Sequence, residues 1–199
     1  ESVSVKTEAF QELFKPYGNT VCKKIKFHHL ENSGMSRFEK IPLYLEWANI
    51  RPTNTKVKEM CKKFGKIVKN KVINSKWVPG VETFLDNFKD RYIFIIVSAT
   101  PQGELNNICR SLNIDKYFYK IFGSPISKSE AIKISLSYYK VLPDKCLMIG
   151  DALADMNAAK ENKIKFIFRK HKENQSLKIH RDTHIIKDFY NIENFFKTK

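Results

Sequence analysis

The sequence predicts an α/β protein, in which a doubly wound parallel sheet is accompanied by an inserted all-helical domain. Up to about residue 76, apolar side chains recur at the three-to-four spacing of helices, with no run that is typical of a strand. From Trp77 onward, short apolar runs alternate with helical segments. This alternation indicates a parallel sheet that is covered by helices on both faces.

The first region, residues 4–76, is expected to form several helices. Ser36 is followed three residues later by Glu39, which is a capping-box signature, so a helix should begin at Arg37. The stretch 56–71 is amphipathic and rich in lysine. We interpret its lysines as a solvated helix face rather than as a groove for nucleic acid.

The second region, residues 77–199, begins with a turn and then supplies the strands. The first apolar run, Tyr92–Val97, is apolar on both faces, as in a central strand of a parallel sheet. Helices are expected between the runs. The expected strands are residues 92–97, 117–122, 145–149, 164–168 and 184–186.

Length and composition limit the class of protein. A chain of 199 residues that is 42% hydrophobic is long enough for one α/β core and a small lobe, which excludes a disordered chain. No apolar run reaches the roughly 18–20 residues that span a bilayer, so we expect no membrane partner and a cytoplasmic location. The net charge of +15 favours a phosphate-bearing partner without choosing one, and nucleic acid is the less favoured. The oligomeric state is left open.

Cysteine and histidine spacing gives no metal framework. The cysteines are widely scattered in apolar patterns and form no CxxC pair, so we interpret them as buried thiols. His180 and His184 have the spacing of a metal pair on a helix, but their surroundings predict loop and strand, so zinc is not expected. The cysteines are Cys22, Cys61, Cys109 and Cys146.

The polar residues that follow the apolar runs are the candidates for a functional site. In a doubly wound sheet, ligands bind beyond the carboxyl ends of the strands. Ser98, Ala99 and Thr100 follow the first run and offer a hydroxyl and successive backbone N–H groups, which suit phosphate oxygens. A plain strand-to-helix cap explains Ser98 almost as well.

A lysine at the start of a helix is the second candidate. Ser127 and Glu130 form a capping-box signature that places Lys128 in the first helical turn. A cation there is locally unfavourable, because the helix N-terminus already carries partial positive charge. A bound phosphate would remove the conflict, and a lysine that extends into water is the alternative.

Paired carboxylates are the third candidate. The run Leu147–Ile149 leads through Gly150 directly to Asp151 and then Asp155, whose spacing brings both side chains to one side of an incipient helix. Two close carboxylates repel each other unless a cation joins them, and Mg²⁺ prefers such oxygen ligands. In the alternative, Asp155 caps the helix while Asp151 is solvated.

The order of these three candidates resembles motifs II, III and IV of the haloacid dehalogenase superfamily. VSAT carries Ser98, SPISK carries Lys128, and GDALAD carries Asp151 and Asp155. The resemblance implies a Rossmann-like core over residues 77–199 and a helical cap over residues 4–76. It also implies that residues 1–3 are the tail of a segment whose DxDG motif, with the nucleophilic aspartate, lies upstream.

The resemblance implies a role for each residue. With the upstream aspartate as nucleophile, an aspartyl-phosphate would form and then be hydrolysed. Ser98 and the N–H groups around Ala99 and Thr100 would hold the phosphoryl oxygens, and Lys128 would neutralise developing charge. Asp151 would bind Mg²⁺, and Asp155 would ligate it or orient a metal-bound water. In the cap, Arg37 could grip an anionic group of the substrate, and Ser36 and His29 are further candidates for substrate contact.

The expected activity is therefore that of a Mg²⁺-dependent phosphatase that acts on a small phosphorylated metabolite. A phosphomutase differs only in what accepts the phosphoryl group, and the sequence leaves both open. A protein that truly lacked the DxDG strand would be inactive. It would then be a binding module that uses its basic surface.

Overall fold

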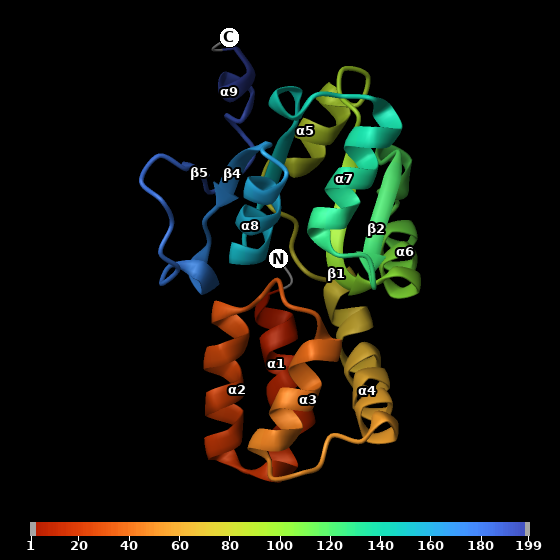
Figure 1. Ribbon diagram of the computed structural model, residues 1–199, viewed down its shortest axis with the longest axis vertical. Coiled ribbons are helices and arrows are strands. Elements are labelled where there is room, and N and C mark those ends of the chain that lie inside the picture. The colour runs from red at the N-terminus through yellow and green to blue at the C-terminus, as the bar shows by residue number, and fades with distance from the viewer. Residues whose placement is uncertain (1–2, 198–199) are drawn as a thin grey trace. The chain divides into compact units, whose positions relative to one another are not determined.

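The computed structural model describes the backbone of residues 3–197 and the side chains of residues 3–196 (Figure 1). Contacts divide the chain into two compact units, Glu1–Ser75 and Lys76–Lys199. The tail segment expected at residues 1–3 lies outside the described residues, except for Val3, which begins the first helix. Among the described helices, none combines the length and the apolar character needed to span a bilayer.

The first unit is all-helical, as the sequence predicted (Figure 1). Its helix α3 begins at Arg37, and the predicted capping box is present, because Ser36 Oγ accepts from Phe38 N while Ser36 N donates to Glu39 Oε1. Gly18, with a φ of +99°, joins a short 3₁₀ turn to α2. The helices are α1 (Val3–Phe14), α2 (Asn19–Glu31), α3 (Arg37–Trp47) and α4 (Asn54–Ile73).

Aromatic packing holds the helical unit together. Phe10 contacts Tyr44 edge to face and packs against Phe64, so that α1, α3 and α4 share one core. The buried face of α3 also carries two cations, Arg37 and Lys40. Buried cations are unusual in a core and require polar partners.

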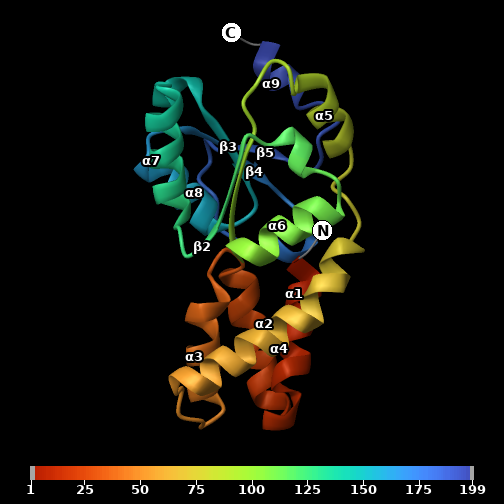
Figure 2. The same cartoon turned by 90° about the vertical axis from the view of Figure 1, so that its right-hand side faces the viewer.

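The second unit alternates strands and helices, which confirms the predicted α/β class. Figure 2 shows α7 and α8 on one side of the strands and α5 and α6 on the other, which is the doubly wound arrangement. The strands are β1 (Ile95–Pro101), β2 (Lys120–Ser124), β3 (Leu147–Gly150), β4 (Lys165–Arg169) and β5 (His184–Ile186). The helices are α5 (Val81–Phe88), α6 (Gln102–Ser111), α7 (Lys128–Tyr139), α8 (Leu153–Glu161) and α9 (Glu193–Lys197).

All strand pairs are parallel, but the strands form two sheets. One sheet has the order β1-β2 and the other has the order β3-β4-β5. Within residues 3–197, β1 and β3 are therefore each hydrogen-bonded along one edge only. Helices link the two sheets, because α7 contacts both β1 and α8, and α8 contacts β3 and β4.

The first three strands begin later than predicted. Strand β1 starts at Ile95 rather than at Tyr92, because Tyr92 N donates to Phe88 O and so closes the turn after α5. Strand β2 starts at Lys120 and β3 at Leu147, because the 3₁₀ turns Asp115–Tyr117 and Pro143–Lys145 precede them. Hydrophobicity marked these runs, whereas local turns set the first residues of the strands.

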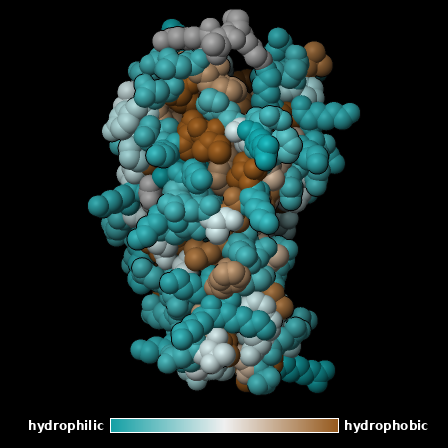
Figure 3. Space-filling model, turned by 90° about the vertical axis from the view of Figure 1, so that its left-hand side faces the viewer, coloured by the Kyte–Doolittle hydropathy of each residue, from teal (hydrophilic) through white to brown (hydrophobic). Residues whose placement is uncertain are grey.

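One face of the protein is mainly hydrophilic (Figure 3), as expected for a chain rich in lysine, and the cysteines are not paired with one another. The hydrophobic side chains on this face occur in small groups (Figure 3). The four cysteines are free thiols, as expected, with three buried and Cys146 half-buried.

Candidate functional site

The first candidate segment lies inside β1 rather than after it. Between Val97 and Pro101 the register of β1 against β2 shifts, so Ser98–Thr100 forms an irregular stretch of the strand. Ser98 Oγ accepts from Thr100 N at 3.2 Å. This hydrogen bond fits a local turn, and it leaves the Ser98 hydroxyl hydrogen able to donate elsewhere.

A glutamine that the sequence analysis missed ties this stretch to β2. Gln102 Nε2 donates to Ile121 O at 2.9 Å, and Gln102 Oε1 accepts from Gly123 N at 2.6 Å. Gly123 is required at this approach, because a Cβ there would lie 2.6 Å from Thr100 O. The tips of β1 and β2 are thus fixed relative to each other.

Lys128 is the first residue of α7, and its ammonium group contacts Asp155 Oδ1. Ser127 Oγ caps the helix by accepting from Glu130 N at 3.1 Å. The negative charge expected beside Lys128 is therefore the carboxylate of Asp155. Both side chains are largely buried, which makes the ion pair a tight link between α7 and α8.

Asp155 also holds the loop that carries Asp151. Its second oxygen, Oδ2, accepts from Asp151 N at 3.3 Å and from Ala152 N at 3.0 Å. A Cβ at Gly150 would lie 2.7 Å from that oxygen, so only glycine leaves room for it. Asp155 thereby connects Lys128 to the end of β3.

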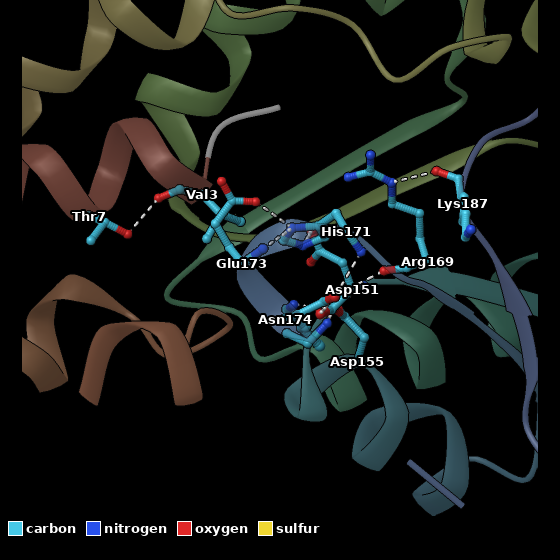
Figure 4. Close-up of polar contacts among 11 residues, drawn as sticks. Val3, Thr7, Asp151, Asp155, Arg169, His171, Glu173, Asn174 and Lys187 are labelled. Atoms are coloured by element: carbon cyan, nitrogen blue, oxygen red, sulfur yellow. Dashed lines mark hydrogen bonds and ion pairs between the residues drawn. The ribbon is translucent and has the colours of Figure 1, made fainter. Parts of the chain in front are cut away.

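Asp151 follows β3 directly and is more accessible than Asp155, with 37% of its side chain exposed. Its Oδ2 lies 3.3 Å from His171 Nε2, and its carbonyl accepts from Asn174 Nδ2 at 2.9 Å (Figure 4). The loop after β4 therefore contacts both the side chain and the backbone of Asp151.

Two carboxylates lie beside the imidazole of His171. Glu173 Oε2 is 2.9 Å from His171 Nδ1, on the opposite side of the ring from Asp151. Burial lowers the pKa of His171, but the contacts with Asp151 and Glu173 outweigh it, so that the pKa is raised above its ordinary value. The His171 contact lowers the pKa of Glu173 although burial opposes it.

His171, Glu173 and Asn174 were missed by the sequence analysis. They lie in a polar segment after β4 that has neither apolar periodicity nor a spacing motif. The one usable signal was position, because this segment follows the carboxyl end of a strand as Asp151 does.

The expected cap residues have partners within the helical unit. Arg37 Nη1 donates to Cys61 O at 3.5 Å, and its guanidinium lies 4.6 Å from the centre of the Phe64 ring. His29 Nδ1 lies 2.8 Å from Lys40 Nζ. Burial, together with the charge of Lys40, lowers the pKa of His29 to about 2, so the ring is neutral.

The α/β unit thus brings together Lys128, Asp155 and Asp151, and it places Ser98 and Thr100 on β1, which α7 contacts. Asp151 offers a hard carboxylate oxygen of the kind that Mg²⁺ prefers, and Mg²⁺ is often held by only one or two carboxylates together with waters. Among residues 3–197, no three histidine, cysteine, aspartate or glutamate side chains converge as a complete metal site. Asp151 could therefore supply one carboxylate ligand of a magnesium site, with the remaining ligands coming from water or from other groups.

The fold and this cluster define the class: a doubly wound α/β protein whose polar site lies at the carboxyl end of a parallel strand. The chain belongs to the haloacid dehalogenase-like hydrolase family, because the model of that family matches residues 4–169. No curated protein matches the chain in sequence.

Several solved structures share the fold. A predicted phosphoglycolate phosphatase from Haemophilus somnus 129PT superposes with a TM-score of 0.77 at 16% identity, covering 98% of this chain and 92% of that chain. CbbY from Rhodobacter sphaeroides in complex with phosphate has a TM-score of 0.77 at 14% identity, with 96% and 90% covered. A β-phosphoglucomutase from Clostridium difficile has a TM-score of 0.75 at 18% identity, with 99% and 90% covered. At these identities the likeness shows the fold alone.

Proposed function

We propose that this protein is a Mg²⁺-dependent phosphomonoester hydrolase that acts on a small phosphorylated metabolite. Membership of a hydrolase family supports the reaction class. The observation that carries the proposal is the cluster in which Asp155 joins the Lys128 ammonium to the backbone of Asp151 at the end of β3. Titles of similar structures name a phosphate complex and a xylulose-(1,5)-bisphosphate complex, which favours a phosphorylated ligand.

In this proposal Lys128 neutralises charge that develops on the phosphoryl group. A fixed ammonium in a largely buried position is effective in this role, because it needs no reorganisation during the reaction. Asp155 keeps the ammonium in place and at the same time orients the Asp151 loop. We therefore assign Asp155 to positioning, while direct ligation of the cation remains the alternative.

Ser98 and the neighbouring N–H group of Ala99 are proposed to hold the phosphoryl oxygens, while the N–H group of Thr100, which donates to Ser98 Oγ, would orient that hydroxyl. The hydroxyl of Ser98 accepts from Thr100 N, so its own hydrogen is oriented away from that bond. The register of β1 against β2 shifts in this stretch, so Ser98 and Ala99 lie outside the regular ladder.

Asp151 would hold Mg²⁺, whose charge stabilises phosphoryl oxygens and the leaving group when it is bound. The accessible carboxylate at the end of β3 suits this role.

The proposal also needs a nucleophilic carboxylate, since residues 1–199 contain no DxDG motif. The half-paired strands β1 and β3 suggest where it would enter. A parallel strand added between them would bring its carboxyl end toward Ser98 and Asp151. Its first aspartate would attack phosphorus to form an aspartyl-phosphate, its second would protonate the leaving oxygen, and water would then release phosphate.

The helical unit is proposed as the cap that chooses the substrate, with the α/β unit from residue 77 onward as the core. Arg37, Ser36 and His29 are proposed for substrate recognition there; Arg37 and His29 are buried, so they would act through the neighbouring groups that they hold. The free thiols favour a reducing compartment, so a cytoplasmic location is part of the same proposal.

The test is hydrolysis of a generic phosphate ester by the full-length protein with Mg²⁺. We expect Asp151→Ala to lower turnover by at least about 100-fold, and chelation of Mg²⁺ to abolish it. Asp144→Ala is the matched control, because Asp144 is an exposed aspartate near β3 that pairs with Lys145, which is also exposed. Unchanged turnover in Asp151→Ala would defeat the metal assignment.

Two other functions are separated by simple observations. A phosphomutase would transfer the phosphoryl group to a second hydroxyl of a sugar phosphate and release little free phosphate. We retain it as an alternative because a β-phosphoglucomutase is among the structures with this fold. A non-catalytic binding module would have no DxDG strand. Reading the coding frame upstream of Glu1 decides this, since a DxDG there supports the enzyme.

A further inference from the structure

A buried histidine lies between two carboxylates at the edge of the proposed site. Only 6% of the His171 side chain is exposed, and its Nε2 and Nδ1 atoms face Asp151 and Glu173, respectively (Figure 4). None of the roles proposed above uses this residue.

The loop that carries His171 is fixed by its own hydrogen bonds. His171 N donates to Asn174 Oδ1 at 2.8 Å, and Glu173 N donates to His171 Nδ1 at 3.3 Å. Asn174 Nδ2 donates to Arg169 O at 3.0 Å and to Asp151 O at 2.9 Å. The imidazole is thus presented by a rigid loop that is already bonded to the backbone of Asp151.

The Nε2 atom points to one partner. It is fully buried, and no hydrogen bond of ordinary geometry satisfies it within the described residues. Asp151 Oδ2, at 3.3 Å, is within ion-pair distance of Nε2. A buried polar atom costs free energy unless it is paired, so a small rotation that completes this contact is favourable.

We propose that His171, anchored by Glu173, is a positioning residue that holds Oδ2 of Asp151 and thereby sets the direction of the carboxylate toward a divalent cation. Partners of this kind fix the orientation of metal ligands and commonly contribute about 10-fold to 100-fold in metal affinity. The inference rests on the proposed function, because it concerns the carboxylate that we assign to the cation.

The test is direct binding of Mn²⁺ to the full chain without substrate, measured by electron paramagnetic resonance. We expect His171→Asn to weaken Mn²⁺ binding by about 10-fold, because the shorter amide reaches only the position of Nδ1 and does not reach Oδ2 of Asp151. His171→Gln places a donor near the position of Nε2 and should stay within about 3-fold of wild type. His180→Asn is the matched control, since His180 is 75% exposed and lies far along the chain from Asp151.

Each outcome decides the matter. Wild-type affinity in His171→Asn would overturn the inference, and so would equal losses in His171→Gln and His171→Asn, because a donor at Nε2 would then be irrelevant. Asp151→Ala separates this inference from the proposed function. If Asp151→Ala binds Mn²⁺ as wild type does, the cation assignment itself fails; if only Asp151→Ala loses binding, the assignment stands and the role of His171 fails.

Discussion

Strand β4 and strands β1 and β3 have similar apolar sequences but differ in burial. Ile167 and Phe168 of β4 have no exposed surface, whereas the apolar residues of β1 and β3 are only half-buried. Within the part of the chain that the structure describes, β4 has a hydrogen-bonded neighbour on each side, and β1 and β3 each have one. The comparison teaches that an apolar run indicates a strand suited to a sheet interior, while the number of its neighbours depends on the rest of the fold.

The largest expected effect tests this difference directly. Ile167→Ala in β4 should lower the free energy of unfolding by about 4 kcal/mol, because it opens a cavity in a closed core. Ile96→Ala in β1 should cost about 2 kcal/mol, since its site is already partly open. Urea unfolding of both variants measures the gap, and equal losses would remove the distinction between the strands.

The same two variants, Ile167→Ala and Ile96→Ala, also test whether a further strand pairs with the edge of β1 opposite β2. If sequence upstream of Glu1 is restored and adds a strand along β1, Ile96→Ala should become nearly as costly as Ile167→Ala. A cost that stays at about 2 kcal/mol would argue against a strand at that edge.

The next effect concerns the glycine at the end of β3. Gly150→Ala should cost about 2–3 kcal/mol, because its Cβ would overlap the Asp155 side chain and loosen the contact with Lys128. Gly103→Ala in α6 is the control, since nothing lies within 4 Å of its Cβ, and it should stabilise by about 0.5–1 kcal/mol. Thermal unfolding of the two variants should therefore shift in opposite directions.

A third prediction uses pH to compare the units. The pKa of His29 is about 2 in the folded chain against an ordinary value of 6.5, so the unfolded chain binds more protons between these values. Its contribution is present above pH 6.5 and is lost as the pH falls toward 2. Between pH 7 and pH 5 we expect wild type to lose about 2 kcal/mol more stability than His29→Gln.

The control for this pH effect is His180→Gln in the α/β unit, which removes an exposed imidazole. Its stability should follow wild type over the same pH range in urea unfolding. A His29→Gln variant that also followed wild type would mean that the ring is protonated inside the folded unit.

The smallest effect is expected on the exposed face of α4. Glu59 pairs with Lys56 and Lys63, but Glu59 and Lys63 are exposed and a third of the Lys56 side chain is accessible. Glu59→Gln should leave the urea midpoint unchanged within error at physiological salt. A clear shift of the urea midpoint would show that this exposed ion pair contributes to stability as much as the half-buried side chains of β1 and β3 do.

Much of the fold followed from local patterns in the sequence. Helical spacing identified the first unit, and Ser36 with Glu39 identified the start of α3. The alternation of runs predicted the α/β class and each described strand, although turns moved the first residues of β1, β2 and β3. The division into two sheets was not readable locally, because it depends on which strands pair.

The candidate site was predictable only in part. The position of residues at the strand ends selected Ser98, Lys128 and Asp151 as candidates, and the roles assigned to them stay predictions. The contact between Lys128 and Asp155 joins residues far apart in sequence, so the position of Lys128 indicated an anion without naming it. His171 carried no periodic or motif signal, and only the folded loop brings it to Asp151.

Lys40 has a practical consequence for experiments on this chain. Its side chain is 1% exposed inside the helical unit, whereas most of the other lysines face water. Amine-reactive reagents should therefore acylate those lysines quickly and Lys40 only when the helices separate. The rate of its labelling, followed by mass spectrometry, would report how often that unit opens.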